Sequence, residues 1–80
     1  MIEAKALVDL DVLQFTVPFA GREVQARITR ETLEKHFEAS TDPSSWLRSY
    51  REHRARIHRA VENLVQAGVR EPVTLRASHF

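Results

Sequence analysis

The sequence predicts a small α+β fold, a two-layer sandwich in which one short and one long helix cover one face of an antiparallel sheet of three or four strands. Apolar and polar residues alternate in three short segments, which is typical of strands with one buried face and one wet face. Two helix-start signatures stand between the second and third of these segments. The expected order is therefore β-β-α-α-β, with an optional strand in front.

Length and composition limit the class of protein. The chain has 80 residues, a length that supports one domain over residues 1–80, and it contains no cysteine that could form a disulfide or a thiolate metal site. A hydrophobic content of 42% and a charged content of 29% exclude collagen-like, disordered and disulfide-scaffold classes. No apolar run approaches the roughly 20 residues of a membrane span, and the acidic opening segment is unlike a signal peptide. We therefore expect a cytoplasmic protein.

The first two strands are expected to form a hairpin. Apolar residues occupy every second position in Leu13–Phe19 and in Val24–Ile28, and Ala20–Arg22 between them supplies a tight reversal. Pro18 cannot donate a backbone hydrogen bond, which predicts that this part of the strand faces an edge or the turn. Residues 1–11 alternate less regularly and are either an extra strand or an irregular arm.

Two helices and a closing strand follow. Thr29 is the expected N-cap of a helix of about two turns, and Asp42, followed by proline, is the expected N-cap of a long helix that ends at Gly68. The apolar side of the long helix consists of Trp46, Leu47, Tyr50, Ile57, Ala60, Val61 and Leu64. Pro72 prevents the helix from resuming, and Val73–Ala77 alternate as a strand.

The spacing of certain residues, most of them apolar, forms one pattern along the chain. These residues are Val17, Pro18, Phe19, Gly21, Val24–Thr29, Leu33, Phe37, Trp46, Leu47, Tyr50, Arg54, Ile57, Val73–Leu75 and Phe80. Over residues 13–80 this pattern resembles a family of short bacterial proteins catalogued only as a domain of unknown function. Members of that family often carry a cysteine where this chain has Ala26. The resemblance implies a small α+β fold and supplies no activity, no cofactor and no catalytic residues.

The residues that could carry catalysis or bind metal lack the spacing that such chemistry needs. The histidines are His36, His53, His58 and His79. His53 and His58 would lie about 140° apart around a helix, so they cannot bind one ion together. Asp9 and Asp11 have neither a third acid nor a glycine loop nearby, which favours a solvated pair. We expect no metal site, no cofactor and no catalytic residues.

Charge is distributed unevenly, with a net charge of −3 over residues 1–42 and +4 over residues 43–80. The candidate interaction surface lies on the long helix and consists of Arg48, Arg51, Arg54, Arg56, Arg59, Trp46 and Tyr50. The two aromatics are either core residues or interface anchors. Arg54 lies beside the apolar stripe, so it either has a structural role or serves as an anion-binding handle. The structural role would be an ion pair with Glu34 or Glu38, or contact with a carbonyl at the C-terminus of a helix.

The sequence favours a non-enzymatic interaction or accessory module that forms a homodimer or binds another protein, with no membrane partner. The unprotected edge of the closing strand Val73–Ala77 is the expected dimer contact. A nucleic-acid-associated regulator that uses the arginine face is the first alternative. The net charge of +1 and the lack of a helix-turn-helix or stacking motif argue against it. An enzyme with an unrecognised site is the second alternative.

Overall fold

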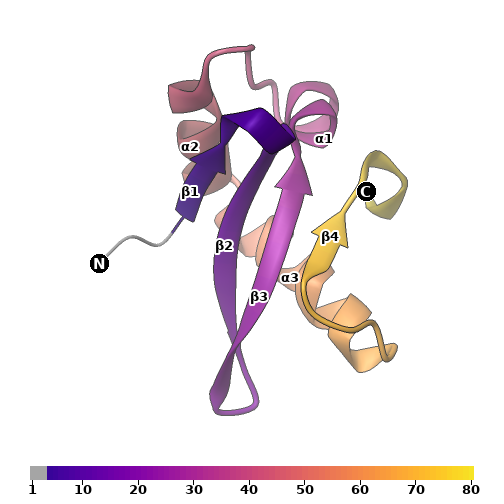
Figure 1. Cartoon of the computed structure of the whole chain (residues 1–80). Coiled ribbons are helices and arrows are strands. Elements are labelled where there is room, and N and C mark those ends of the chain that lie inside the picture. The colour runs from indigo at the N-terminus through magenta and orange to yellow at the C-terminus, as the bar shows by residue number, and fades with distance from the viewer. Residues whose placement is uncertain (1–3) are drawn as a thin grey trace.

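A computed structural model describes residues 4–80 as a four-stranded sheet with a layer of helices on one side (Figure 1). The elements are β1 (Ala4–Leu7), the 3₁₀ turn η1 (Val8–Leu10), β2 (Val12–Phe19), β3 (Arg22–Thr29), α1 (Arg30–His36), α2 (Pro43–Glu52), α3 (Arg54–Gln66), β4 (Val73–Leu75) and the 3₁₀ turn η2 (Ala77–His79). The α+β class and the order of elements are confirmed. The opening segment is a short strand followed by a turn.

The sheet has the order β1-β2-β3-β4 and is mixed. β2 pairs antiparallel with β1 and with β3, whereas β4 runs parallel to β3, with Ala26 opposite Val73 and Ile28 opposite Leu75. The prediction of an antiparallel sheet fails only at this last pair. The alternation of apolar and polar residues indicates that a strand has one buried face, but it does not indicate the direction of the strand. The crossover through the helix layer returns the chain to the end of the sheet where β3 begins, so β4 runs parallel to β3.

The helix layer and one face of the sheet enclose the core. Its buried residues are Leu13, Phe15, Val17, Val24, Ala26, Ile28, Leu33, Phe37, Ala39, Trp46, Tyr50, Ile57, Val61, Val73 and Leu75. The strand residues among them are every second residue of β2, β3 and β4, as the pleat of a sheet requires. In Figure 1 all three helices lie behind the sheet, so the other face is left open within residues 4–80.

The predicted helix ends are confirmed. The hydroxyl of Thr29 accepts a hydrogen bond from the backbone N–H three residues later, at 3.2 Å. The carboxylate of Asp42 accepts one from the backbone N–H two residues later, at 3.3 Å, and Pro43 is the first residue of α2. Gly68 has a φ of +92° and follows the last turn of α3, where its N–H and that of the next residue bind carbonyls of that turn.

The predicted long helix is wrong in one respect, because it breaks into α2 and α3 at His53. His53 has φ −116° and ψ 21°, so it leaves the helical path. A straight helix over residues 43–66 would be roughly 36 Å long, whereas the largest extent of the described chain is 33 Å. The break lets α2 pack under β1 and α3 under β2 and β4.

Candidate functional site

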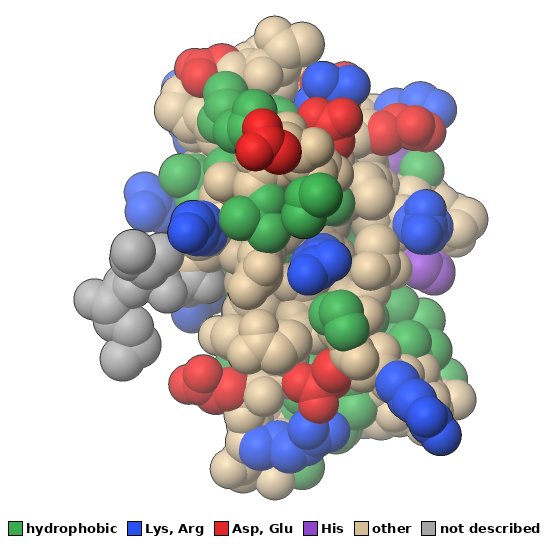
Figure 2. Space-filling model, in the orientation of Figure 1, with side chains coloured by type: hydrophobic (Ala, Val, Ile, Leu, Met, Phe, Trp, Pro, Cys, Tyr) green, Lys and Arg blue, Asp and Glu red, His purple; other side chains and the backbone are tan. Residues whose placement is uncertain are grey.

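The open face of the sheet carries a row of polar side chains that crosses all four strands. Lys5, Gln14, Arg27 and Thr74 are successive partners in the register, so their side chains point to the same side. Thr16 and Gln25 form the next row toward the hairpin turn. Figure 2 shows this face, with basic and apolar side chains across its middle and with both acidic and basic ones above and below. Opposite the core, the sheet therefore presents a polar, cationic band.

The two cations of this band have no acidic partner among the residues that the structure describes. Within residues 4–80 neither Lys5 nor Arg27 forms an ion pair, although Arg22 pairs with Glu71 at 2.6 Å and Arg30 lies 3.6 Å from an acid of the β1–β2 connection. The Nε atom of Arg27 is also buried without a hydrogen-bond acceptor. A buried donor without an acceptor is uncommon in folded proteins. Arg27 therefore has both a free charge and a free donor.

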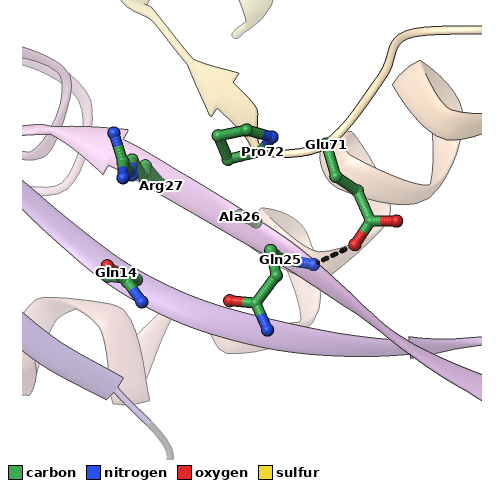
Figure 3. A pocket seen from close by; sticks show the side chains of 6 residues that line it. All are labelled: Gln14, Gln25, Ala26, Arg27, Glu71 and Pro72. Carbon is green, nitrogen blue, oxygen red and sulfur yellow. Dashed lines mark hydrogen bonds between the residues drawn. The ribbon is translucent and has the colours of Figure 1, made fainter.

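A hollow of about 350 Å³ lies beside Arg27. It is lined by Gln14, Gln25, Ala26, Arg27, Glu71 and Pro72. Figure 3 shows the side chains of β2 and β3 along one side and Pro72, from the segment before β4, across from Arg27. The hollow is open to solvent, and the polar groups around it are amides, a guanidinium and a carboxylate.

The carboxylate of Glu71 is fully engaged by its neighbours. Oε1 accepts the backbone N–H of Gln25 at 2.7 Å, and Oε2 accepts from the guanidinium of Arg22 at 2.6 Å. These contacts, first the backbone N–H and then the guanidinium, lower the pKa of Glu71 below its ordinary value. Glu71 is therefore ionised near neutral pH, and its charge is offset by Arg22 rather than by Arg27.

The other end of the open face is apolar. Val8 and Leu10 in η1 are 55% and 60% exposed, and η1 directly follows the edge strand β1. A shallow hollow of about 310 Å³ is lined by Ala6, Leu7, Val8, Asp9 and Leu10. Exposed large apolar side chains that adjoin a strand edge are typical of a contact surface.

The two aromatic residues of the predicted helix surface belong to the core. Trp46 is 1% exposed and Tyr50 is 0% exposed. The indole N–H of Trp46 donates to the carbonyl of Ser40 at 3.1 Å, and the Tyr50 hydroxyl lies 2.6 Å from Nε2 of His58. Both polar atoms are satisfied inside the protein, so neither residue can contribute to an exposed surface.

The five helix arginines are exposed but are divided between two helices. Arg48 and Arg51 lie on α2, and Arg54, Arg56 and Arg59 lie on α3 beyond the break. The guanidinium of Arg56 stacks on the rings of Phe37 and Phe80, at 5.2 and 5.6 Å from their centroids. Glu34, one of the two acids considered as partners of Arg54, lies 3.7 Å from the guanidinium of Arg30.

The histidines are separated and border aromatic residues. His53 packs on Phe37 with ring centroids 4.9 Å apart, and His58 stacks on Phe15 at 5.8 Å. Within residues 4–80 no group of three histidine, aspartate or glutamate side chains is placed to hold a metal ion. The polar nitrogen of His58 is used internally by Tyr50.

A further hollow of about 280 Å³ lies between α2 and the loop that precedes it. Ser49 and His53 both line it, one helical turn apart, which raises the question of a nucleophile and its base. The described residues contain no hydrogen bond between these two side chains, and the His53 ring packs on Phe37. This geometry does not activate the serine.

Lys5, Gln14 and Arg27 are absent from the candidate residues that the sequence predicts. In the sequence these residues are polar members of alternating segments. The alternation predicts that such residues face solvent, but it does not show which of them form a site. Only the register of the sheet brings the three side chains into one row.

No helix in residues 4–80 has the length and apolar character needed to cross a membrane. Comparison of the chain with curated proteins and with solved structures finds no match. The family described as "Protein of unknown function (DUF1488)" matches residues 6–76, which confirms the resemblance seen in the sequence and extends it into β1. With its α+β fold and a match over most of its length, the chain belongs to this family of unknown function.

Proposed function

We propose that the protein is a non-enzymatic interaction module of the bacterial cytoplasm and that it works as a homodimer. The observation that carries this proposal is the position of β1 at an edge of the sheet formed by residues 4–80, with the exposed side chains of Val8 and Leu10 beside it. A marginal core of this size gains stability when a second copy covers such a patch. The module would bind other proteins through the open face of the same sheet.

The edge of β1 supports a dimer better than the edge of β4. β4 has only three residues, and the chain turns away from it at once into η2. Phe80, just after that turn, packs edge-on against Phe37 with ring centroids 5.0 Å apart, which ties the segment to its own core. β1 has four described residues, contains no proline and leads into the exposed apolar turn.

The side chains of β1 favour one register for a two-fold contact. Lys5 is a charged edge residue, and a register centred on it would place two lysines opposite each other, which is unfavourable. A register centred on Ala6 places Lys5 opposite Leu7 of the partner subunit, because partners in an antiparallel pair share a face. The lysine can then cover the leucine with its aliphatic stem while its ammonium group stays in water.

Sedimentation velocity at tens of micromolar tests the proposed homodimer. We expect the wild-type protein to sediment at twice the monomer mass of 9.2 kDa. The double variant Val8→Ser, Leu10→Ser should sediment as a monomer, because it removes the apolar contact. Val69→Ser is the matched control, since Val69 is also an exposed apolar residue, at 43%, but lies after α3. A wild-type monomer, or a double variant that remains dimeric, would contradict the proposal.

The alternative function, nucleic-acid binding, is tested by titrating the protein with nucleic acid. Within residues 4–80 the open face carries no aromatic side chain on which a base could stack, and the helix arginines are divided by the break at His53. At about 0.15 M salt we expect neither duplex DNA nor single-stranded RNA to bind more tightly than roughly micromolar. A tighter complex that is lost on reversing Arg51 and Arg59 would support the regulator instead.

A further inference from the structure

We infer that the hollow on the open sheet face binds a carboxylate side chain presented by an extended acidic segment of a partner protein. The inference rests on the proposed function, because it names the partner that the open face of the module would bind. It depends on Arg27 and its surroundings and does not depend on the contact between two copies.

The hollow has the donors that a carboxylate needs. The Nε–H of Arg27 is buried without an acceptor, and the side-chain amides of Gln14 and Gln25 line the same space (Figure 3). A guanidinium presents its N–H groups in a fork that matches the two oxygens of a carboxylate. A small shift of the Arg27 side chain would present to an incoming carboxylate this Nε–H, which no acceptor within residues 4–80 engages.

The charges around the hollow also favour an anion. Glu71 is the acid that lines it, and both of its oxygens are engaged by Arg22 and the backbone of Gln25. Within the described part of the chain this leaves the charge of Arg27 without an acidic partner, and Lys5 lies in the same row two strands away. Neighbouring strands are about 4.8 Å apart, so the backbones that carry these two cations are separated by roughly 10 Å.

An extended segment fits this arrangement better than a free metabolite. Alternate side chains of an extended chain point to the same side and recur about 7 Å apart, so acids at alternate positions can reach Arg27 and Lys5 together. The hollow is open to solvent, whereas small-molecule sites enclose most of the ligand surface. The surrounding rows of glutamine and threonine can bind the peptide backbone.

The test is a fluorescence anisotropy titration with a short labelled peptide of alternating glutamate and threonine. We expect saturable binding of this peptide and none of the matched peptide of alternating glutamine and threonine. In a ¹⁵N–¹H spectrum of the wild-type protein, the side-chain amide signals of Gln14 and Gln25 should shift as the site fills. Shifts confined to α2 and α3, or equal binding of free N-acetylglutamate, would overturn the inference.

Variants distinguish binding in the hollow from a general effect of the protein's positive charge. Arg27→Gln should weaken binding by about tenfold, which corresponds to about 1.4 kcal/mol. Arg27→Lys should also weaken it severalfold, because it keeps the charge but lacks the Nε–H. Lys5→Gln, at an exposed position, should cause a smaller loss without affecting the fold. Arg59→Gln is the matched control, since it removes the same charge from an exposed site on α3.

The peptide titrations and the sedimentation experiment together distinguish failure of the carboxylate site from failure of the proposed homodimer. Equal affinity of wild-type protein, Arg27→Gln and Arg27→Lys, or an equal loss in Arg59→Gln, would overturn the assignment of the hollow. A wild-type protein that is dimeric by sedimentation but does not bind the acidic peptide would overturn the inference and leave the homodimer standing. A monomer that binds the peptide through Arg27 would overturn the homodimer and support the hollow.

Discussion

Glu71 shows how one side chain can extend a sheet beyond the end of a strand. β4 begins at Val73, opposite Ala26, so the backbone N–H of Gln25 has no partner strand on that side. The carboxylate of Glu71 accepts this N–H at 2.7 Å and also binds Arg22. A side chain thus replaces a strand at the point where the open-face hollow begins.

The lowered pKa of Glu71 predicts a pH dependence of stability. Because the pKa is lower in the folded state, the ionised carboxylate stabilises the fold above the ordinary glutamate value of 4.5. That contribution is lost as pH falls below 4.5 through the lower folded-state value. Thermal melts of wild type and Glu71→Gln should therefore differ most near neutral pH and converge in acid. A difference in melting temperature that stays constant across this range would contradict the assignment.

Burial distinguishes two residues that the helical pattern places on the same stripe. Ile57 is 0% exposed, whereas Leu64 only packs against the margin of the core. We expect Ile57→Ala to lower the free energy of unfolding by ~2 to 4 kcal/mol and Leu64→Ala by less than ~2 kcal/mol. Urea unfolding of both variants measures this, and equal losses would show that Leu64 is as buried as Ile57.

The hairpin between β2 and β3 turns on two residues with left-handed backbones. Ala20 has a φ of +53° and Gly21 a φ of +81°, the pattern of a type I′ turn. Alanine is strained in this region, and asparagine followed by glycine is the preferred pair. Ala20→Asn should raise the free energy of unfolding by up to about 1 kcal/mol, because asparagine adopts the left-handed conformation at lower cost, and Ala20→Val should lower it. Denaturant unfolding decides the sign, and a destabilised Ala20→Asn protein would contradict this account of the turn.

Whether an element can be predicted depends on whether its signal is local. Thr29, Asp42 and Gly68 satisfy backbone groups within a few residues of themselves, so the sequence marks these helix ends correctly. The break at His53 has no local mark, since residues 44–66 contain neither glycine nor proline. The break results from the size of the sheet, which α2 and α3 cover together. This size is a property of the whole fold.

At the scale of the whole molecule, the class could be predicted and the surface could not. Alternation in three strands requires a sheet with one wet face, and the structure has one. The predicted candidate surface nevertheless lies on the helix arginines, because they are close together in the chain. Lys5 and Arg27 are far apart in the sequence and meet in one row only through the register of β1, β2 and β3.

We propose that β1 pairs with β1 of a second copy, and hydrogen–deuterium exchange of the β1 amides would detect this pairing. The amides of Ala4–Leu7 that do not bond to β2 are open to solvent in a monomer and would be bonded across the two-fold contact. Their exchange should slow as protein concentration rises from below micromolar to tens of micromolar, while exchange in β4 should stay unchanged. Exchange in β1 that is the same at all concentrations, or slowing that falls on β4 instead, would contradict the claim.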